Sequence, residues 1–309
     1  MTVLDPRLSA AESPLAPLTV ITPTSMDEAL RLLAAPDAAV LGGGVGHTLR
    51  RHDRRPAVAT TLVSVGSLPG LGDITWSAGG VSIGAGVKLS ACAADPRLTA
   101  AWPVVTEAAG SVATGRIRRM VTLGGNIAAL DDSHDPPVAL TAVGAELLVR
   151  GTGGSRTLAI GDLRELRADE LIEHVRLPLP TASDAVRSGS AYEKFLVRGV
   201  WEYACVNVGA VVGLGADGTA VRLSLAVGSV TGGPVAVDLS ELLGAPFDQR
   251  LVAEAAGVAV AATRPYSDVR GSAAYKSRMI AEFSRRALTA AARRAGQDPS
   301  APAVPGGNR

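Results

Sequence analysis

The chain contains little cysteine, few aromatic residues and no long apolar run, and each shortage excludes a class of function. It has 309 residues, with two cysteines and four histidines, and aromatic residues make up only 3% of it. An iron–sulfur cluster needs about four thiolates, so this chain cannot hold one alone. It has no C-x-x-C, no H-E-x-x-H and no closely spaced His/Cys cluster, so we expect no metal site.

Charge and hydropathy exclude further classes of partner. Lysine and arginine total 30 against 29 acidic residues, a net charge of +1, which offers no electrostatic footprint for nucleic acid or an anionic membrane. The N-terminus lacks the basic start and apolar stretch of a secretory signal. The longest mainly apolar run, residues 203–216, is too short and too rich in glycine to span a bilayer. Two thiols in a chain this long fit a reducing compartment, and we expect a cytoplasmic protein.

The first part of the chain predicts a small parallel sheet. Hydrophobic residues make up 47% of the sequence, which is enough for a sizeable core. After a polar arm, residues 1–16, three short apolar runs read as strands: 18–21, 38–41 and 62–65. A capping box of Ser25 and Glu28 begins a helix after the first strand, and "LRRHDRRPA" reads as a loop before the third. We assign residues 17–70 to this unit.

Two further units follow. Residues 71–178 predict helices that begin at Pro103 and Pro136, a glycine-rich turn at 124–125, and antiparallel strands between 146 and 178. Residues 179–190 read as a linker, and residues 191–295 as a domain with a β-hairpin over 204–230 and two closing helices. In the last helix Tyr275, Met279, Phe283 and Ala287 repeat every four residues and predict its apolar face. We expect the tail from Gly296 to be disordered.

Two glycine-rich segments are candidates for a ligand site. The first, "LGGGVGHTLR" (41–50), follows a predicted strand, and its glycines let backbone amides approach a phosphate. It is not a dinucleotide-binding fingerprint, because His47 stands where the third glycine belongs, and no Gly-Lys-Ser/Thr follows as in a Walker loop. An ordinary turn is the alternative interpretation.

The second segment is "TLGGNIAALDDSHD" (122–135). Thr122 and Asn126 flank two glycines and could offer hydroxyl, amide and backbone donors to an anionic ligand. Asp135 stands just before Pro136 and could accept hydrogen bonds from a sugar hydroxyl, or simply cap the helix. Two such segments without a catalytic triad or metal set favour cofactor binding over hydrolysis.

The second segment and its surroundings resemble the FAD-binding subunit of the molybdenum hydroxylases, a family that includes the medium subunit of carbon monoxide dehydrogenase and the flavin domain of xanthine dehydrogenase. The resemblance covers nearly the whole chain and is carried by six motifs in order. They are "LVSVGSLPGL", "GRIRRMVTLGGNIA", "DDSHDPPVALTAVGAELLV", "DELIEHVRLP", "YEKFLVRGVWEYACVNVGAVV" and "DVRGSAAYKSRM".

This resemblance implies an α+β fold of the PCMH type, with two α/β subdomains that hold FAD between them and a C-terminal antiparallel sheet with helices. It implies that the first glycine segment contacts the pyrophosphate, through Gly42, Gly43, Gly44, Val45, Gly46 and His47. The second segment would contact phosphate and the ribityl chain, through Thr122, Gly124, Gly125 and Asn126. Asp135 would bind a hydroxyl group of the cofactor. Leu171 and Ile172 would pack near the flavin or adenine, unless they are plain core residues, and Tyr192 would approach the isoalloxazine.

The sequence departs from the family in both segments. Leu41 replaces an alanine, and Val45 and Gly46 replace a polar residue and a leucine, so a side-chain contact there is lost. The usual Ser-Pro-Ala-Ser before Asp135 is "DDSH" (131–134), and two carboxylates beside a pyrophosphate would repel it unless they point away. His134 is the one group in this loop that titrates near neutrality, so it is our candidate acid/base residue, with an exposed loop histidine as the alternative.

Three functions follow from the resemblance. In the first, the chain accepts electrons from the iron–sulfur subunit of a complex that also has a molybdopterin subunit, and passes them through FAD to an acceptor such as NAD or oxygen. In the second, it is a free-standing, homo-oligomeric flavoenzyme that oxidises a small metabolite with Asp131, Asp132 and His134 facing the substrate. In the third, it is a flavin-free scaffold, which the intact glycine segments disfavour.

Overall fold

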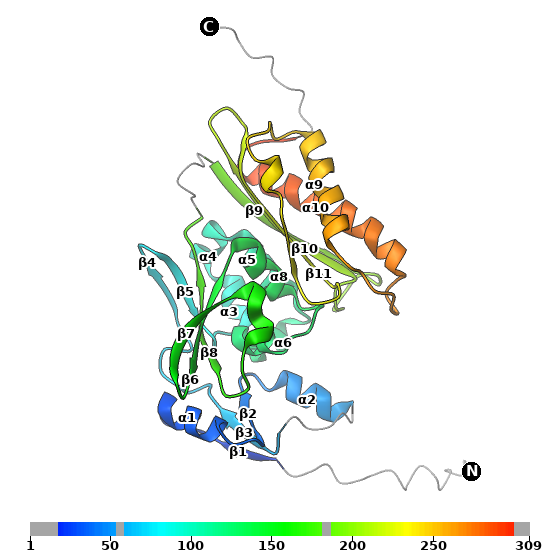
Figure 1. Ribbon diagram of the computed structural model, residues 1–309. Coiled ribbons are helices and arrows are strands. Elements are labelled where there is room, and N and C mark those ends of the chain that lie inside the picture. The colour runs from blue at the N-terminus through cyan, green and yellow to red at the C-terminus, as the bar shows by residue number, and fades with distance from the viewer. Residues whose placement is uncertain (1–17, 54–58, 181–186, 300–309) are drawn as a thin grey trace, which may run out of the picture.

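The structure is a computed structural model that describes residues 18–53, 59–180 and 187–299. It has three units along the chain: a small subdomain at the bottom of Figure 1, a larger central subdomain, and a C-terminal sheet with two long helices. This confirms the predicted α+β fold class. The predicted arm, residues 1–16, lies outside the described residues.

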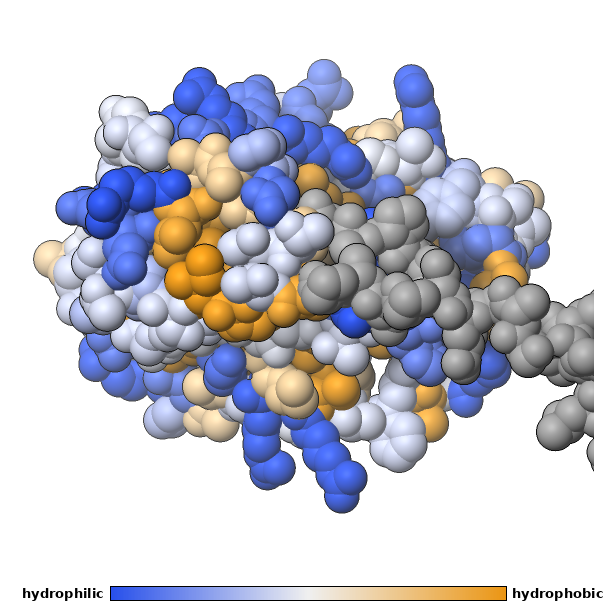
Figure 2. Space-filling view, turned by 90° about the horizontal axis from the view of Figure 1, so that it is seen from below, coloured by the Kyte–Doolittle hydropathy of each residue, from blue (hydrophilic) through white to orange (hydrophobic). Residues whose placement is uncertain are grey.

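The first subdomain is built as the sequence predicts, with one added helix. Its strands β1 (Thr19–Ile21), β2 (Ala38–Leu41) and β3 (Thr61–Ser64) form a parallel sheet in the order β1-β3-β2. Helix α1 (Met26–Leu33) is capped by Ser25, while the Glu28 carboxylate accepts from the amide of Thr24. Seen from below, apolar residues gather on this end of the molecule within a rim of hydrophilic ones (Figure 2).

The added helix corrects a predicted loop. Helix α2 (Val45–His52) begins directly after the first glycine segment, and its last turn carries arginines that we had assigned to a connection. None of its residues is buried, and only Val45 and Leu49 repeat at helical spacing, which is too short a pattern to indicate a helix in sequence.

The central subdomain packs a cluster of short helices against one face of an antiparallel sheet (Figure 1). The sheet order is β4-β5-β8-β6-β7, and its strands are β4 (Ile74–Ser77), β5 (Gly80–Gly84), β6 (Glu146–Gly151), β7 (Gly154–Ala159) and β8 (Leu171–Leu177). The helices are α3 (Leu89–Ala94), α4 (Pro96–Ala101), α5 (Pro103–Ser111), α6 (Gly115–Met120), α7 (Leu123–Ala128), α8 (Asp135–Val143) and the 3-10 helix η2 (Ile160–Glu165). The antiparallel strands and the helices at Pro103 and Pro136 confirm the prediction.

The C-terminal domain is a four-stranded antiparallel sheet in the order β12-β11-β10-β9. It consists of β9 (Arg187–Phe195), β10 (Val206–Leu214), β11 (Ala220–Gly228), β12 (Val235–Val237), η3 (Ser240–Leu242), α9 (Gln249–Ala262) and α10 (Ala273–Arg294). Helices α9 and α10 cover one face, and α5 and α8 of the central subdomain pack on the other (Figure 1). Because helices cover both faces, every residue of β10 is buried.

Close packing of α8 on this sheet depends on two glycines. A Cβ at Gly209 would lie 3.0 Å from the Cβ of Ala142, and one at Gly228 would lie 2.4 Å from Val138. A side chain at either position would push α8 away from the sheet. The start of α8 is therefore held at a fixed place between the central and C-terminal parts.

Three predicted features of the C-terminal part differ from the structure. Strand β9 begins at Arg187, inside the predicted linker, of which residues 181–186 lie outside the described part of the chain. The buried face of α10 is rotated relative to the predicted one. It contains the predicted Phe283 and Ala287, but Lys276, Ile280 and Ser284 are buried with them in place of Tyr275 and Met279. The tail is ordered at its start, because the Gln297 side chain donates to the carbonyl of Phe247 over 2.7 Å; residues 300–309 lie outside the described chain.

Candidate active site

A crevice of about 990 Å³ runs between the first subdomain and the central subdomain and reaches the edge of the C-terminal domain. Both glycine segments border it. All but one of the predicted site residues line it, namely Gly42, Gly43, Gly44, Val45, Gly46, His47, Thr122, Gly124, Gly125, Asn126, His134, Asp135, Leu171 and Ile172. Tyr192 is the exception.

The first glycine segment contacts the second directly. A Cβ at Gly43 would lie 1.9 Å from the carbonyl oxygen of Met120, and one at Gly42 would lie 2.6 Å from the Thr122 hydroxyl oxygen. Gly44 has a φ of +75°, a left-handed conformation that glycine adopts without strain. These three glycines let the turn after β2 lie against the chain that enters α7, so the two segments form one wall.

Helix α2 offers an anion site at this wall. Val45, Gly46 and His47 form its first turn, where helix geometry provides no carbonyl acceptor for the amides, and the helix dipole places partial positive charge there. The turn has no acidic residue. The His47 ring is not part of this donor set, because its Nε2 donates to the carbonyl of Val40 over 2.9 Å.

The second glycine segment differs from the predicted turn. It is the helix α7, and its first amides are already bonded within the protein: those of Leu123 and Gly124 donate to the carbonyls of Val87 and Ala85, each over 2.8 Å. The Gly125 amide donates to the Thr122 hydroxyl oxygen over 3.2 Å. The prediction that this backbone supplies ligand donors is therefore wrong. Its side chains remain available, at Thr122 and Asn126.

Comparison with known proteins identifies the family. The family described as "FAD binding domain in molybdopterin dehydrogenase" matches residues 16–180, and that of the "CO dehydrogenase flavoprotein C-terminal domain" matches residues 190–291. The chain belongs to the FAD-binding subunit family of the molybdenum hydroxylases. Its cofactor is therefore FAD, and it is an oxidoreductase.

Individual relatives agree along almost their whole length. The chain is 31% identical to the carbon monoxide dehydrogenase medium chain of Afipia carboxidovorans, over 88% of this chain and 96% of the relative. It is 30% identical to 6-hydroxypseudooxynicotine dehydrogenase complex subunit alpha of Paenarthrobacter nicotinovorans, over 88% and 93%. A solved carbon monoxide dehydrogenase from Hydrogenophaga pseudoflava superposes with a TM-score of 0.83 at 30% identity, over 90% of this chain and 98% of that one.

The crevice of this family member fits a flavin dinucleotide. Asn126 is 5% exposed, and its Oδ1 has no hydrogen-bond partner among the described residues. A buried acceptor without a partner is costly, so an orphaned oxygen on the crevice wall indicates a missing ligand group. Leu171 and Ile172, at the start of β8, also line the crevice, and both are buried members of the hydrophobic cores beside it.

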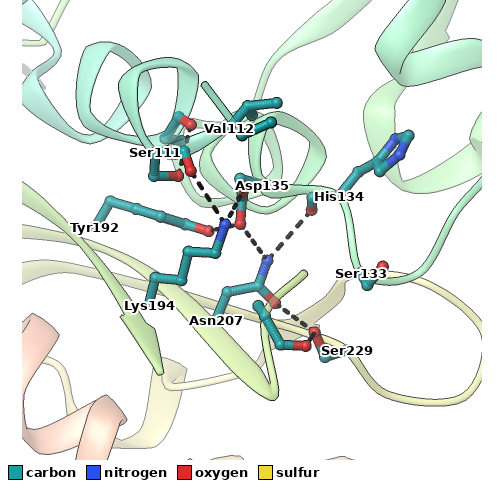
Figure 3. Close-up of polar contacts among 12 residues, drawn as sticks. Ser111, Val112, Ser133, His134, Asp135, Tyr192, Lys194, Asn207 and Ser229 are labelled. Atoms are coloured by element: carbon teal, nitrogen blue, oxygen red, sulfur yellow. Dashed lines mark hydrogen bonds and ion pairs between the residues drawn. The ribbon is translucent and has the colours of Figure 1, made fainter. Parts of the chain in front are cut away.

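Asp135 is held in a buried polar network (Figure 3). Lys194 Nζ lies 2.7 Å from its Oδ2, and the Tyr192 hydroxyl donates to its Oδ1. The side-chain amide of Asn207 donates to the same Oδ1 and to the carbonyl of His134, each over 3.3 Å. Its oxygens are thus largely engaged by strands β9 and β10, so the start of α8 is fixed from the C-terminal domain.

Tyr192 does not line the crevice, so the prediction that it approaches the isoalloxazine is wrong. Its side chain is buried in that network, and burial together with the charge of Asp135 raises its pKa well above the ordinary value. The tyrosines that line the crevice are Tyr203 and Tyr266. Tyr203 lies inside a motif that the sequence analysis quoted, but no local pattern distinguishes it from Tyr192.

Of the two additional carboxylates in the second segment, Asp131 lines the crevice and Asp132 does not. Asp132 forms an ion pair of 2.8 Å with Arg164, away from the glycines. Asp131 accepts from both the amide and the hydroxyl of Ser133. Burial would raise the pKa of Asp131, but these two bonds, together with the nearby His134 and Arg270, outweigh burial and hold the pKa below its ordinary value. Repulsion is thereby limited to one carboxylate.

His134 is positioned by its neighbours. Its Nδ1 donates to the carbonyl of Asn126 over 2.9 Å, and its ring stacks on Tyr203 with centroids 6.1 Å apart. Crevice residues that the sequence analysis did not single out include Ala85, Gly86, Lys194, Trp201, Tyr266 and Arg270. Some of them lie inside the quoted motifs, but those motifs do not indicate which of their residues face the crevice. Only folding brings these segments together, which is why sequence reasoning missed them.

None of the described helices is long and apolar enough to cross a membrane.

Proposed function

We propose that this chain takes electrons from the iron–sulfur clusters of a molybdopterin hydroxylase complex and passes them through FAD to an external acceptor such as NAD or oxygen. When bound, FAD supplies the capacity to take up electrons singly and to release them in pairs. The observation that carries the proposal is the shared crevice, where the glycine turn after β2 meets helix α7 beside the unpartnered oxygen of Asn126.

Each wall of the crevice has its own part in binding. The first-turn amides of α2, at Val45, Gly46 and His47, bind the diphosphate, where the helix dipole favours negative charge. Asn126 and the Thr122 hydroxyl bind polar groups of the cofactor, and Leu171 and Ile172 pack against an apolar ring. Asp135 accepts a hydrogen bond from a cofactor hydroxyl through a carboxylate lone pair that Tyr192, Lys194 and Asn207 do not use.

Electron transfer fits the crevice better than direct oxidation of a metabolite. Three titratable groups of the second segment that line the crevice already have protein partners: His134 bonds Asn126, Asp131 bonds Ser133, and Asp135 bonds Lys194. Groups held in this way orient the cofactor and set its electrostatic surroundings. A free-standing flavoenzyme drew its support from the carboxylates at 131 and 132, and Asp132 turns to Arg164 instead.

The names of the relatives point to a multi-subunit assembly. They are described as medium chains or as a complex subunit, and this chain matches more than nine-tenths of each. We therefore propose an iron–sulfur subunit and a molybdopterin subunit as partners. Both cysteines are free and buried, which agrees with a reducing, cytoplasmic setting.

Anaerobic stopped-flow spectroscopy tests the electron-transfer role. The FAD-loaded chain is mixed with its reduced iron–sulfur subunit, and flavin absorbance is followed. The proposal predicts rapid bleaching by the reduced iron–sulfur subunit and no bleaching by small organic metabolites other than NADH, the reduced form of a proposed acceptor, at the same electron equivalents. Bleaching by a metabolite without any iron–sulfur subunit would support the free-standing flavoenzyme instead.

A further inference from the structure

Exposed apolar side chains are concentrated in two loops that each contribute residues to the crevice lining. In the segment 197–203, Val200 is 64% and Trp201 73% exposed, and Val197 and Tyr203 are also exposed. Val269, in the neighbouring loop, is 98% exposed. By contrast, Trp102 is 1% exposed in the core. A cluster of this kind on a protein surface marks an interaction site more often than chance exposure does.

The tip that carries Trp201 is preformed. The Glu202 carboxylate accepts from the amide of Arg198 over 2.8 Å and forms an ion pair with its guanidinium, which closes the turn. Gly199 has a φ of +102° and Trp201 a φ of +55°. A left-handed conformation is a genuine outlier for a bulky side chain, and such strain persists where a local structure is over-determined for function.

The tip is also fixed to the loop that carries Val269. Arg270 lies over the ring of Tyr203, with its Cζ 5.7 Å from the ring centroid. Asp268 holds Arg270 through an amide bond of 2.8 Å and a guanidinium bond of 2.9 Å, and the buried Lys276 pairs with Asp268 at 3.0 Å. Two loops from distant parts of the sequence thus form one rigid apolar rim.

We infer that this rim, Val197, Val200, Trp201 and Val269, is the docking surface for the iron–sulfur subunit, with Trp201 as its anchor. The inference rests on the proposed function, since that function needs an electron donor brought close to the flavin. Trp201, Glu202, Tyr203 and Arg270 line the crevice itself, so a protein seated on the rim covers the crevice mouth. A rigid, exposed tryptophan with aliphatic neighbours is the kind of residue that dominates binding energy at interfaces.

Calorimetric titration of the FAD-loaded chain with its iron–sulfur subunit tests this surface. The informative variant is Trp201→Gly, because glycine tolerates the left-handed backbone and removes the ring without straining the fold. We expect its affinity for the iron–sulfur subunit, measured on FAD-saturated protein, to fall at least about tenfold. The matched control is Leu243→Ser, since Leu243 is 45% exposed but does not line the crevice, and it should bind as the wild type does.

Each other outcome overturns the inference in a distinguishable way. Equal binding by Trp201→Gly and wild type shows that the rim is not the docking surface. Loss of FAD from Trp201→Gly shows that the tryptophan is a wall of the cofactor site. A change from dimer to monomer in light scattering, with iron–sulfur binding unchanged, shows that a second copy of this chain covers the rim. If the wild type itself binds no iron–sulfur subunit, the proposed function fails with it.

Discussion

At the scale of single residues, the crevice depends on positions that tolerate no side chain. Gly43 lies against the backbone at Met120, and backbone atoms cannot move aside as a flexible side chain can. We predict that Gly43→Ala separates the two glycine segments, lowers the free energy of unfolding by about 1–3 kcal/mol and weakens FAD binding. Urea unfolding and FAD titration measure the two effects.

Gly257→Ala is the matched control for this substitution. Gly257 lies in the middle of α9 on its solvent-exposed side, and an added Cβ there meets no atom within 4 Å. Alanine should leave FAD binding unchanged and stabilise the helix slightly. If Gly43→Ala binds FAD as well as Gly257→Ala does, close packing of the two segments is not needed for the site.

At the scale of elements, an ion pair ties strand β7 to the start of β8 beside the crevice. Arg156 donates two hydrogen bonds to Glu170, over 2.7 and 2.8 Å, and this lowers the pKa of Glu170 from 4.5 to about 2. A carboxyl group whose pKa is lower in the folded state stabilises the protein above its unfolded pKa. That stability is lost as the pH falls from about 4.5 toward 2, and it amounts to at most about 3 kcal/mol.

We predict that Glu170→Gln flattens this part of the pH profile. Its free energy of unfolding, measured by urea at intervals from pH 6 to pH 2.5, should fall less steeply than that of the wild type. Glu282→Gln is the control, because Glu282 pairs with arginines on the surface of α10 and such pairs contribute under about 1 kcal/mol. Parallel profiles for Glu170→Gln and the wild type would contradict the assignment.

Elements also show how far the sequence could be read. The strands of the first sheet, the β10–β11 hairpin and the helix at Pro103 have strong local patterns, and all were predicted. Helix α2 has eight residues and buries none of them, and α7 has six residues with two glycines, so each is too short for its apolar pattern to indicate a helix. In the sequence, the two glycines of α7 therefore had the pattern of a turn, although Gly124 serves the close packing of the helix against Ala85.

At the scale of the whole molecule, the C-terminal domain holds one end of α8 at the crevice. Asn207 is fully buried, donates to the start of α8 and accepts from the Ser229 hydroxyl over 3.2 Å. A Cβ at Gly228 would lie 2.4 Å from its Oδ1, so the facing strand leaves room for this amide. We predict that Asn207→Ala lowers both the free energy of unfolding, by about 1–3 kcal/mol, and the affinity for FAD.

Ser224→Ala separates these two effects. The Ser224 hydroxyl donates to the carbonyl of Ala142 over 2.6 Å, so it joins the same sheet to the opposite end of α8. Its loss should lower stability by about 1 kcal/mol and leave FAD affinity unchanged, as calorimetry and urea unfolding can determine. Equal FAD affinity in the Asn207 and Ser224 variants would show that the domain contact does not position the site.

The whole-molecule contacts could not be predicted from sequence. Tyr192, Lys194 and Asn207 each lie more than 50 residues after their partner Asp135 in the sequence. The residue types alone do not indicate which of them are in contact. The family resemblance placed Asp135 at the cofactor site but could not distinguish Tyr192 from Tyr203. That distinction needs the register of β9 on β10, which places Tyr192 opposite Gly209 and inside the network.

The account depends most on FAD binding in the crevice against Asn126. Calorimetric titration of FAD into the flavin-free chain tests it directly, with wild type and Asn126→Ala compared. We predict one FAD per wild-type chain and at least about tenfold weaker binding by the variant, while the unfolding free energy of the flavin-free variant stays within about 1 kcal/mol of the wild type, because the amide oxygen has no protein partner to lose. Absence of FAD binding by the wild type, or equal binding by both proteins, would contradict the account.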